Sequence, residues 1–243
     1  MTIEAERPKQ PRAVRRDARR NRELLVSAAR EAFAAQGLNA PLDEIARRAG
    51  VGNATLYRHF PTRADLVEEV FHGALADTVT AGDAARGGED AWRALAGYLA
   101  AVFASLAADR GTNDLMTTGI SGVRSLDAVH ARNRETLDLL IGRAQRQGTM
   151  RQDVTTEDLL FSLAALGRAV PALTDTAPQA WRRYLTLFLD GLRTADTPAT
   201  ALPAPGLTTE ELADVLSSLG PHRTQAAPLH GDNGQAPGSV HGP

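Results

Sequence analysis

The chain has 243 residues, of which 43% are hydrophobic and 23% are charged, a composition typical of a folded protein with one large or two smaller domains. No segment approaches eighteen consecutive apolar residues, so we expect no membrane-spanning helix and no membrane partner. The polar, arginine-rich N-terminus argues against a secretory signal. The lack of cysteine excludes disulfides and thiolate metal sites. Together these features predict a cytoplasmic protein.

Charge is distributed unevenly along the chain. Residues 1–63 contain 13 Lys and Arg against 7 Asp and Glu, whereas the remaining residues contain 14 against 22. A basic segment joined to an acidic one is typical of a protein that docks one end onto a polyanion such as DNA. The alternative is a basic tail that only aids solubility.

The first residues predict a mobile arm followed by two helices. Residues 1–18 are polar and basic, and we expect them to be disordered. Helical periodicity begins at Arg19 and ends at Gly37, with one apolar face formed by Leu25, Ala29 and Phe33. A shorter helix follows, which begins at Pro41 and ends at Gly50. Its buried face is predicted to contain Leu42, Ile45, Ala46 and Ala49.

Two more helices complete this region. Asn53 is a residue type suited to an N-cap, and the helix that it begins is expected to end near Phe60, before Pro61. Thr62 is predicted to cap a longer fourth helix. The apolar residues of that helix are Leu66, Val67, Val70, Phe71 and Leu75.

The rest of the chain also shows helical periodicity, and no segment alternates as a strand would. Helices are expected at residues 90–109, 126–147, 156–170, 177–193 and 208–219, with loops and one short helix between 111 and 125. The fold class is therefore all-α. We expect a disordered basic arm (1–18), a helix-turn-helix DNA-binding domain (19–64), a larger helical effector-binding and dimerisation domain (65–196), a Pro-rich linker with an extra helix (197–220) and a disordered tail (221–243).

The segment Leu42–Phe60, LDEIARRAGVGNATLYRHF, has the features of a helix-turn-helix, in which one helix braces a second that enters the major groove of DNA. Small residues at Ala49 and Gly50 are expected to permit a tight crossing. At these residues the chain resembles the TetR (tetracycline-repressor-like) family of transcriptional regulators. The resemblance covers about residues 19–75, and its most specific part is the run Leu56, Tyr57, His59 and Phe60 followed by Arg63.

The resemblance implies which residues contact DNA. Those that begin the recognition helix should face the bases, and the others should contact the groove edge or the phosphates; the predicted set is Arg47, Arg48, Gly52, Asn53, Ala54, Thr55, Tyr57, Arg58, His59 and Arg63. Position 41 departs from the family pattern. Many members place a Ser or Thr there, whose hydroxyl caps the helix, and the side chain of Pro41 has no such group. The alternative for Tyr57 and His59 is packing between the first and fourth helices.

The resemblance also implies that the larger domain dimerises and holds a ligand pocket. The low aromatic content of 5% favours a small apolar or amphipathic effector. The predicted effector-binding residues are Trp92, Leu99, Phe103, Met116, Val129, His130, Asn133, Leu137 and Phe161. Two apolar stripes on consecutive helices suit the interface of a homodimer, with an intramolecular core as the alternative. The predicted dimer residues are Leu159, Leu163, Leu166, Gly167, Val170, Trp181, Tyr184, Leu185, Phe188 and Leu192.

The predicted function is therefore a dimeric repressor, bound to a palindromic operator in double-stranded DNA and released by a small molecule. The alternative is a DNA-binding regulator without such an effector, controlled by a protein partner or by its own abundance. We expect no enzyme activity, no cofactor and no metal site. The segment Gly119–Val123 fails the nucleophile-elbow pattern at its last position, and Gly50–Gly52 follows a helix rather than a strand.

Overall fold

The computed structural model describes residues 12–117, 122–194 and 202–219. Within these ranges the chain is helical, with one isolated antiparallel bridge between Met150 and Arg193. The predicted all-α fold is confirmed. The expected disordered tail, and residues 1–11 of the expected arm, lie outside the described residues.

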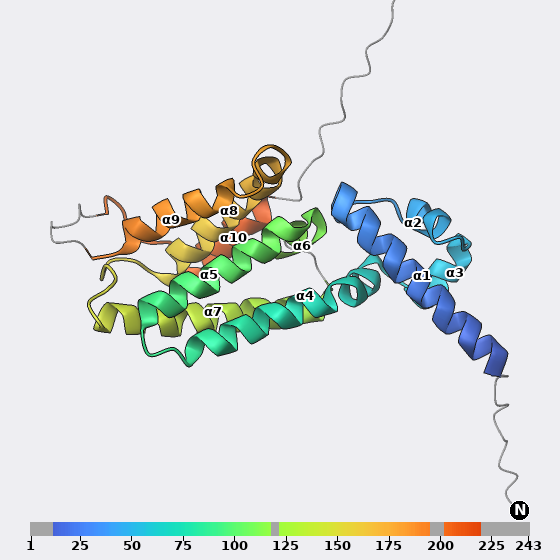
Figure 1. The fold of residues 1–243 in the computed structure, drawn as a ribbon, viewed down its shortest axis with the longest axis horizontal. Coiled ribbons are helices and arrows are strands. Elements are labelled where there is room, and N and C mark those ends of the chain that lie inside the picture. The colour runs from blue at the N-terminus through green and yellow to red at the C-terminus, as the bar shows by residue number, and fades with distance from the viewer. Residues whose placement is uncertain (1–11, 118–121, 195–201, 220–243) are drawn as a thin grey trace, which may run out of the picture.

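Three helices form a small unit at one end of the molecule, which we call the head: α1 (Arg12–Gln36), α2 (Leu42–Arg48) and α3 (Asn53–His59). Figure 1 shows them in blue and cyan, apart from the bundle of helices that forms the body. The predicted apolar face of α1 is confirmed, because Leu25, Ala29 and Phe33 are all fully buried. Ile45 and Leu56 pack into the same core, and this fixes α2 against α3.

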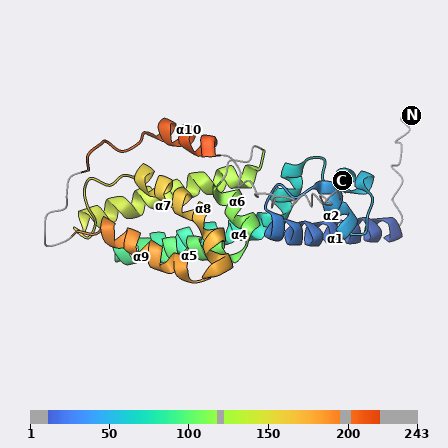
Figure 2. The same cartoon turned by 90° about the horizontal axis from the view of Figure 1, so that it is seen from above.

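The N-terminal part of α1 differs from the prediction. The helix begins at Arg12, so residues 12–18 are helical rather than disordered. Arginine and alanine are strong helix formers, and the Arg19 Nε donates a hydrogen bond to Glu23 Oε1 at 2.9 Å, one turn along. No residue from Arg15 to Leu24 is buried. The first turns of α1 therefore extend beyond the core of the head (Figures 1 and 2).

The turn between α2 and α3 needs glycine for a different reason from the one predicted. A Cβ at Gly50 would meet no atom within 4 Å, so close crossing of the helices is not the constraint. Instead Gly50 has a φ of +70°, which disfavours other residues. The N-cap of α3 is Gly52, so Asn53 is the first helical residue rather than the cap.

Helix α4 (Arg63–Arg86) belongs to both parts of the molecule. Thr62 caps it as predicted, in a reciprocal capping box with Asp65. The core of the head also includes residues of the body, among them Leu115, Leu126 and Val129. The expected boundary at residue 64 thus falls at the start of a continuous helix, and the two parts share one apolar cluster instead of being joined by a linker.

The body is a bundle of α4 with six further helices: α5 (Ala91–Ala108), α6 (Arg110–Thr117), α7 (Arg124–Arg146), α8 (Thr156–Thr176), α9 (Ala180–Leu192) and α10 (Thr209–Leu219). A second core fills the space between α5, α7, α8 and α9. At its centre the rings of Phe103 and Trp181 stack with centroids 6.0 Å apart. Helix α10 lies along the outside of the bundle (Figure 2).

Helix α5 is long and apolar enough to cross a membrane, with a mean hydropathy of 1.4 over Ala91–Ala108. Its buried residues, which include Leu95, Leu99 and Phe103, belong to the core of the body. The central helix of a bundle meets the same criteria of length and composition as a membrane span. The hydropathy of α5 is therefore explained by its place in the bundle.

Helix α8 continues beyond the predicted end at Val170, with Pro171 inside it, as far as Thr176. Proline disfavours a helix interior because it lacks an N–H donor. Leu173, in the extra turn, packs against the core of the body. Tertiary packing of that turn outweighs the local preference to end the helix.

Candidate functional site

The predicted DNA-contact residues of α3 lie mostly on the outer surface of this helix. Leu56 is buried, whereas Tyr57, which follows it directly, is 52% exposed. The remaining predicted residues at the start and outer side of this helix are exposed or half-buried, namely Gly52, Asn53, Ala54, Thr55 and Arg58. The alternative in which Tyr57 packs between helices is wrong, because its ring faces solvent.

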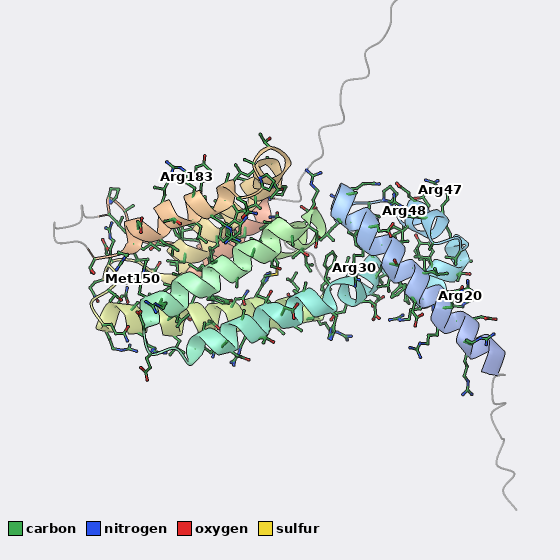
Figure 3. All side chains as sticks on the ribbon, viewed as in Figure 1. Arg20, Arg30, Arg47, Arg48, Met150 and Arg183 are labelled. Carbon is green, nitrogen blue, oxygen red and sulfur yellow. The ribbon has the colours of Figure 1, made fainter. Side chains whose placement is uncertain are left out.

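Arg47 and Arg48 lie on α2, in the head (Figure 3). Both are exposed. The Arg48 Nη2 donates to Glu44 Oε1 at 3.0 Å, an i,i+4 ion pair that partly neutralises its charge. Arg47 forms no such pair among the interactions found in the described residues. The two neighbouring arginines therefore differ in the charge that they present to an anion.

Arg63 was predicted to bind a phosphate, but its guanidinium is directed into the protein. Its Nη1 donates to the carbonyl oxygens of Leu38 and Ala40, both at 2.8 Å, and the side chain is half-buried. Burial lowers the pKa of Arg63, against the opposite effect of Tyr57. The side chain thus ties the start of α4 to the loop between α1 and α2, and its role in the described structure is to hold the head together.

His59 is half-buried, and its Nε2 atom is buried without a hydrogen-bond partner in the described part of the chain. Burial lowers the pKa of the imidazole, and the charges of Arg58 and Arg22 lower it further. Because Nε2 is buried, this ring nitrogen cannot contact a phosphate oxygen. The packing alternative for His59 agrees with the structure.

Arg22 is a residue that the sequence interpretation missed. Its guanidinium lies 4.4 Å from the centre of the Phe60 ring, and its Nη2 donates to Glu69 Oε2 at 2.8 Å. Nη1 also donates to the His59 carbonyl oxygen at 3.3 Å. Arg22 therefore joins α1 to the end of α3 and to α4. The segment contains many arginines, and nothing in the local sequence distinguishes Arg22 from its neighbours.

The body contains an apolar cavity of about 580 Å³ between α5, α6, α7, α8 and α10. Its volume lies within the range of small-molecule sites. Of the predicted effector-binding residues, Met116, His130 and Asn133 line it. The rest of the wall was not predicted: Val102, Leu106, Thr117, Ala131, Arg134, Leu160, Leu163, Ala164, Thr209, Leu212, Ala213 and Leu216.

The other predicted effector-binding residues do not line this cavity, although Phe103 lines a second one between α5, α8 and α9. Leu99, Phe103 and Leu137 belong to the core of the body, and Val129 to the core of the head. Trp92 lies beneath the guanidinium of Arg193, 5.4 Å from its ring centre, and Phe161 is 41% exposed. Helical periodicity places residues on a face but does not show which face borders a cavity.

Polar groups in the cavity wall are arranged so that they carry little net charge. Desolvation lowers the pKa of His130, although part of the residue is exposed, against the opposite effects of Asp127 and the Met116 carbonyl oxygen. The Arg134 Nη1 is 2.6 Å from Glu157 Oε1, which neutralises the guanidinium. The amide oxygen of Asn133 accepts a hydrogen bond from the Tyr98 hydroxyl at 2.7 Å. Burial raises the pKa of Tyr98 to about 12 despite the charge of Arg86.

Helix α6 connects the cavity to the head. Met116 and Thr117 line the cavity, and Asp114, on the same helix, reaches the end of α1. There its Oδ2 accepts a hydrogen bond from the Leu38 N–H at 3.1 Å. Gly37, which ends α1 with a φ of +76°, lies so close that a Cβ would be 2.2 Å from Asp114 Oδ2. The wall of the cavity and the end of α1 are thus held by one short helix.

The predicted dimer stripe is mostly part of the protomer's own core, as the intramolecular alternative stated. The fully or nearly fully buried members are Leu159, Gly167, Val170, Trp181, Leu185 and Leu192. Leu163, Leu166 and Phe188 pack against the same core. Tyr184, at 47% exposed, is the member that faces solvent. The periodicity on α9 correctly marked a buried face, but the protomer itself buries it.

A second apolar surface remains uncovered on α8 and α9. Tyr184 and Leu187 on α9 are 47% and 56% exposed, and Phe161 on α8 is 41% exposed. Tyr184 and Leu187 are three residues apart and therefore share one face of α9. Exposed apolar side chains of this size on neighbouring helices suit an interaction surface.

Two parts of the chain match known protein families. Residues 25–70 match the family described as bacterial regulatory proteins, tetR family, and residues 90–194 match the C-terminal domain of SbtR-like transcriptional regulators. An uncharacterised HTH-type transcriptional regulator, TtgW of Pseudomonas putida, is 40% identical over 55 residues, which cover 22% of this chain and 41% of that protein. The chain thus matches less than half the length of this curated relative.

Solved structures extend the likeness along the chain. The TetR transcription regulatory protein from Mycobacterium vanbaalenii is 35% identical over 74% of this chain and 99% of its own, with a TM-score of 0.41. The ketosteroid transcriptional regulator KstR2 of Mycobacterium tuberculosis has the same fold, with a TM-score of 0.57 at 20% identity over 72% of this chain and 95% of its own. This chain belongs to the TetR family of DNA-binding transcriptional regulators.

Proposed function

We propose that the protein is a dimeric repressor that binds a palindromic operator and leaves it when a small apolar ligand enters the body. The observation that carries the proposal is the position of α6, which borders the 580 Å³ cavity and also holds the end of α1 through Asp114. A ligand that prefers a different position of α6 would also change the position of α1, and coupling requires such a preference.

The DNA-binding part of the proposal rests on the head. The exposed residues of α3 would enter the major groove, and Arg47 would contact the phosphate backbone beside it. The first turns of α1 add Arg15, Arg16, Arg19 and Arg20, which are all exposed. A helix that extends beyond its own core with this charge suits contacts with phosphates outside the recognition helix.

The dimer part rests on the exposed patch of Phe161, Tyr184 and Leu187. A two-fold axis through α8 and α9 would cover this patch with the same patch of the partner, because an isologous interface is self-complementary. Two recognition helices about 34 Å apart would then reach successive turns of DNA. The known tendency of this family to bind DNA as dimers supports this arrangement.

The ligand is expected to be largely apolar and without a full negative charge. The cavity wall is mostly aliphatic, and its one guanidinium is already paired with Glu157. Thr117, Asn133 and neutral His130 offer hydrogen bonds to one polar group. The family is one of regulators rather than enzymes, so we propose binding and release of this ligand without chemical conversion.

The test uses fluorescence anisotropy with DNA from the region upstream of the protein's own gene, beside a scrambled duplex of equal length at matched salt. Binding at least about a thousandfold tighter to the native DNA supports the proposal. Neutral apolar compounds are then added to the complex, and a saturable loss of anisotropy together with quenching of Trp fluorescence identifies an effector. Tight binding that no compound relieves would favour control by a protein partner or by abundance.

A further inference from the structure

Helix α10 lies outside the part of the chain that matches the C-terminal domain of the family. That match ends at residue 194, whereas α10 spans Thr209–Leu219. Its residues Thr209, Leu212, Ala213 and Leu216 nevertheless form part of the cavity wall. We propose that α10 is a removable wall of the effector cavity, which is displaced when the ligand enters and closes over it afterwards. This inference rests on the proposed effector-binding function.

The apolar contact of α10 is small. Leu212, at 2% exposed, is the one fully buried side chain among the described residues of this helix, and Leu216, one turn later, is half-buried. Both line the cavity, as do Leu160 and Leu163 of α8, beside which α10 runs (Figure 2). An isolated helix of this length is unstable in water, so α10 depends on this face for its structure.

The beginning of α10 is also held to the bundle by a polar contact. The Thr209 hydroxyl donates to Glu157 Oε1 at 3.0 Å, and the same oxygen accepts the hydrogen bond from Arg134. Burial raises the pKa of Glu157, but the hydrogen bonds from Arg134 and Thr209 and the charge of Arg134 outweigh this effect and lower it. Glu157 therefore remains ionised and connects α7, α8 and α10.

The segment before α10 is also pressed against the body. A Cβ at Gly206 would lie 3.0 Å from the Thr155 Oγ1 and 3.5 Å from Asp158 Oδ1, at the start of α8. Thr208 and Glu211 cap α10 reciprocally, through N–H to side-chain hydrogen bonds of 2.8 and 3.2 Å. Helix α10 is thus fixed at its start, and Leu212 is its one fully buried side chain among the described residues. The rest of the helix can therefore move outward without unfolding the bundle.

The same geometry explains how the ligand would close the cavity. Leu212, Ala213 and Leu216 face the cavity volume, so an apolar ligand inside it would extend the surface against which they pack. Each buried methylene group adds to the stability of the closed helix. Substitutions on this face of α10 would therefore change both the entry rate of the ligand and the size of ligand accepted.

The absence of cysteine from the chain permits a test that needs no ligand. A single cysteine introduced by Ala164→Cys would lie in the cavity wall on α8, half-buried beside α10. Its rate of reaction with 5,5′-dithiobis(2-nitrobenzoic acid) reports access to the part of the cavity between α8 and α10. We expect the added pair Leu212→Ala and Leu216→Ala to raise this rate at least about tenfold. An unchanged rate would overturn the proposal.

Two matched controls separate displacement of α10 from general loosening. Glu210→Ala changes an exposed residue of the same helix that does not line the cavity, and it should leave the rate of Ala164→Cys within about twofold. Ala131→Cys lines the cavity at an exposed position on α7 and should react rapidly in every background. A tenfold rise at both cysteine positions would indicate that the bundle had loosened, and would count against a local displacement.

A second measurement separates this inference from the proposed function. The neutral apolar probe N-phenyl-1-naphthylamine, mixed rapidly with the full-length protein, should bind at least about fivefold faster in the Leu212→Ala and Leu216→Ala variant. Binding at equal rates would contradict the displacement of α10 but leave the effector site intact. Failure of the probe and of all apolar compounds to bind would contradict the effector site, whereas the cysteine rates would still decide whether α10 opens.

Discussion

The carboxylate of Asp114 on α6 accepts a hydrogen bond from the backbone N–H of Leu38, at 3.1 Å, in the loop that follows α1. These residues are 76 positions apart in sequence, and both are buried. The contact joins a cavity-lining helix of the body to the end of α1 in the head. Gly37 permits the approach, since any side chain there would collide with the carboxylate.

Asp114→Ala should destabilise the folded protein by about 1–3 kcal/mol, because the buried Leu38 N–H would lose its acceptor. Urea unfolding followed by circular dichroism measures this loss. Asp77→Ala, at an exposed position on α4, is the matched control and should change stability by less than about 0.5 kcal/mol. Equal effects of the two substitutions would show that the contact contributes nothing to stability.

Arg47 and Arg63 should respond differently to replacement by alanine. Arg47→Ala should weaken operator binding and reduce the salt dependence by about one counterion, with no change in melting temperature. Arg63→Ala should lower the melting temperature, because the Leu38 and Ala40 carbonyl oxygens lose their donor. Anisotropy titrations at several salt concentrations, beside thermal melts, separate the two. A fully stable Arg63→Ala protein with a reduced salt slope would restore the phosphate role predicted for it.

The first turns of α1 should contribute to DNA affinity through charge alone. Replacing Arg15, Arg16 and Arg20 with alanine should reduce the slope of log affinity against log salt by about two to three, equally for operator and scrambled DNA. The control is a protein with three alanine substitutions in the body, far from the head: Arg146 on α7, and Arg182 and Arg183 on α9. A slope that falls as much in the control would show that overall charge, rather than α1, sets the salt dependence.

Leu187 and Leu185 lie two residues apart on α9 but should give opposite results. Leu187→Glu, on the exposed patch, should yield a folded monomer that binds the operator weakly. Leu185→Glu should unfold the body, because it would place an unpaired charge in the core. Sedimentation and circular dichroism distinguish these outcomes. An intact Leu187→Glu dimer would exclude the patch from the interface.

Acidification from pH 7 to pH 5 should lower the melting temperature. Desolvation of the imidazole lowers the pKa of His130 in the folded state although part of the residue is exposed, whereas the unfolded value is about 6.5. Protonation therefore favours the unfolded chain once the pH falls below 6.5, and the loss continues until the pH reaches the folded pKa. His130→Gln should reduce the pH dependence. Identical pH profiles for both proteins would exclude a contribution from His130.

The class of the protein and the arrangement of helices in its head could be predicted from local features of the sequence. Leu25, Ala29 and Phe33 repeat at helical spacing, and the glycine turn with the run from Leu56 to Phe60 identifies the DNA-binding unit, because these signals are local and depend on periodicity and turn conformation. Most residues of α3 that face outward were predicted for the same reason. The start of α1 was missed because its arginines suggested an arm rather than a helix.

Tertiary structure alone decided which apolar stripes are covered and by what. Trp181 and Leu185 have the spacing of an interface, but α5 of the same protomer covers them, and periodicity cannot name the covering surface. Arg63 was predicted to bind phosphate, yet carbonyl groups more than twenty residues earlier in the chain hold it. The cavity is formed by side chains from five helices, including α10, so its lining depends on how those helices pack and could not be derived from any one of them.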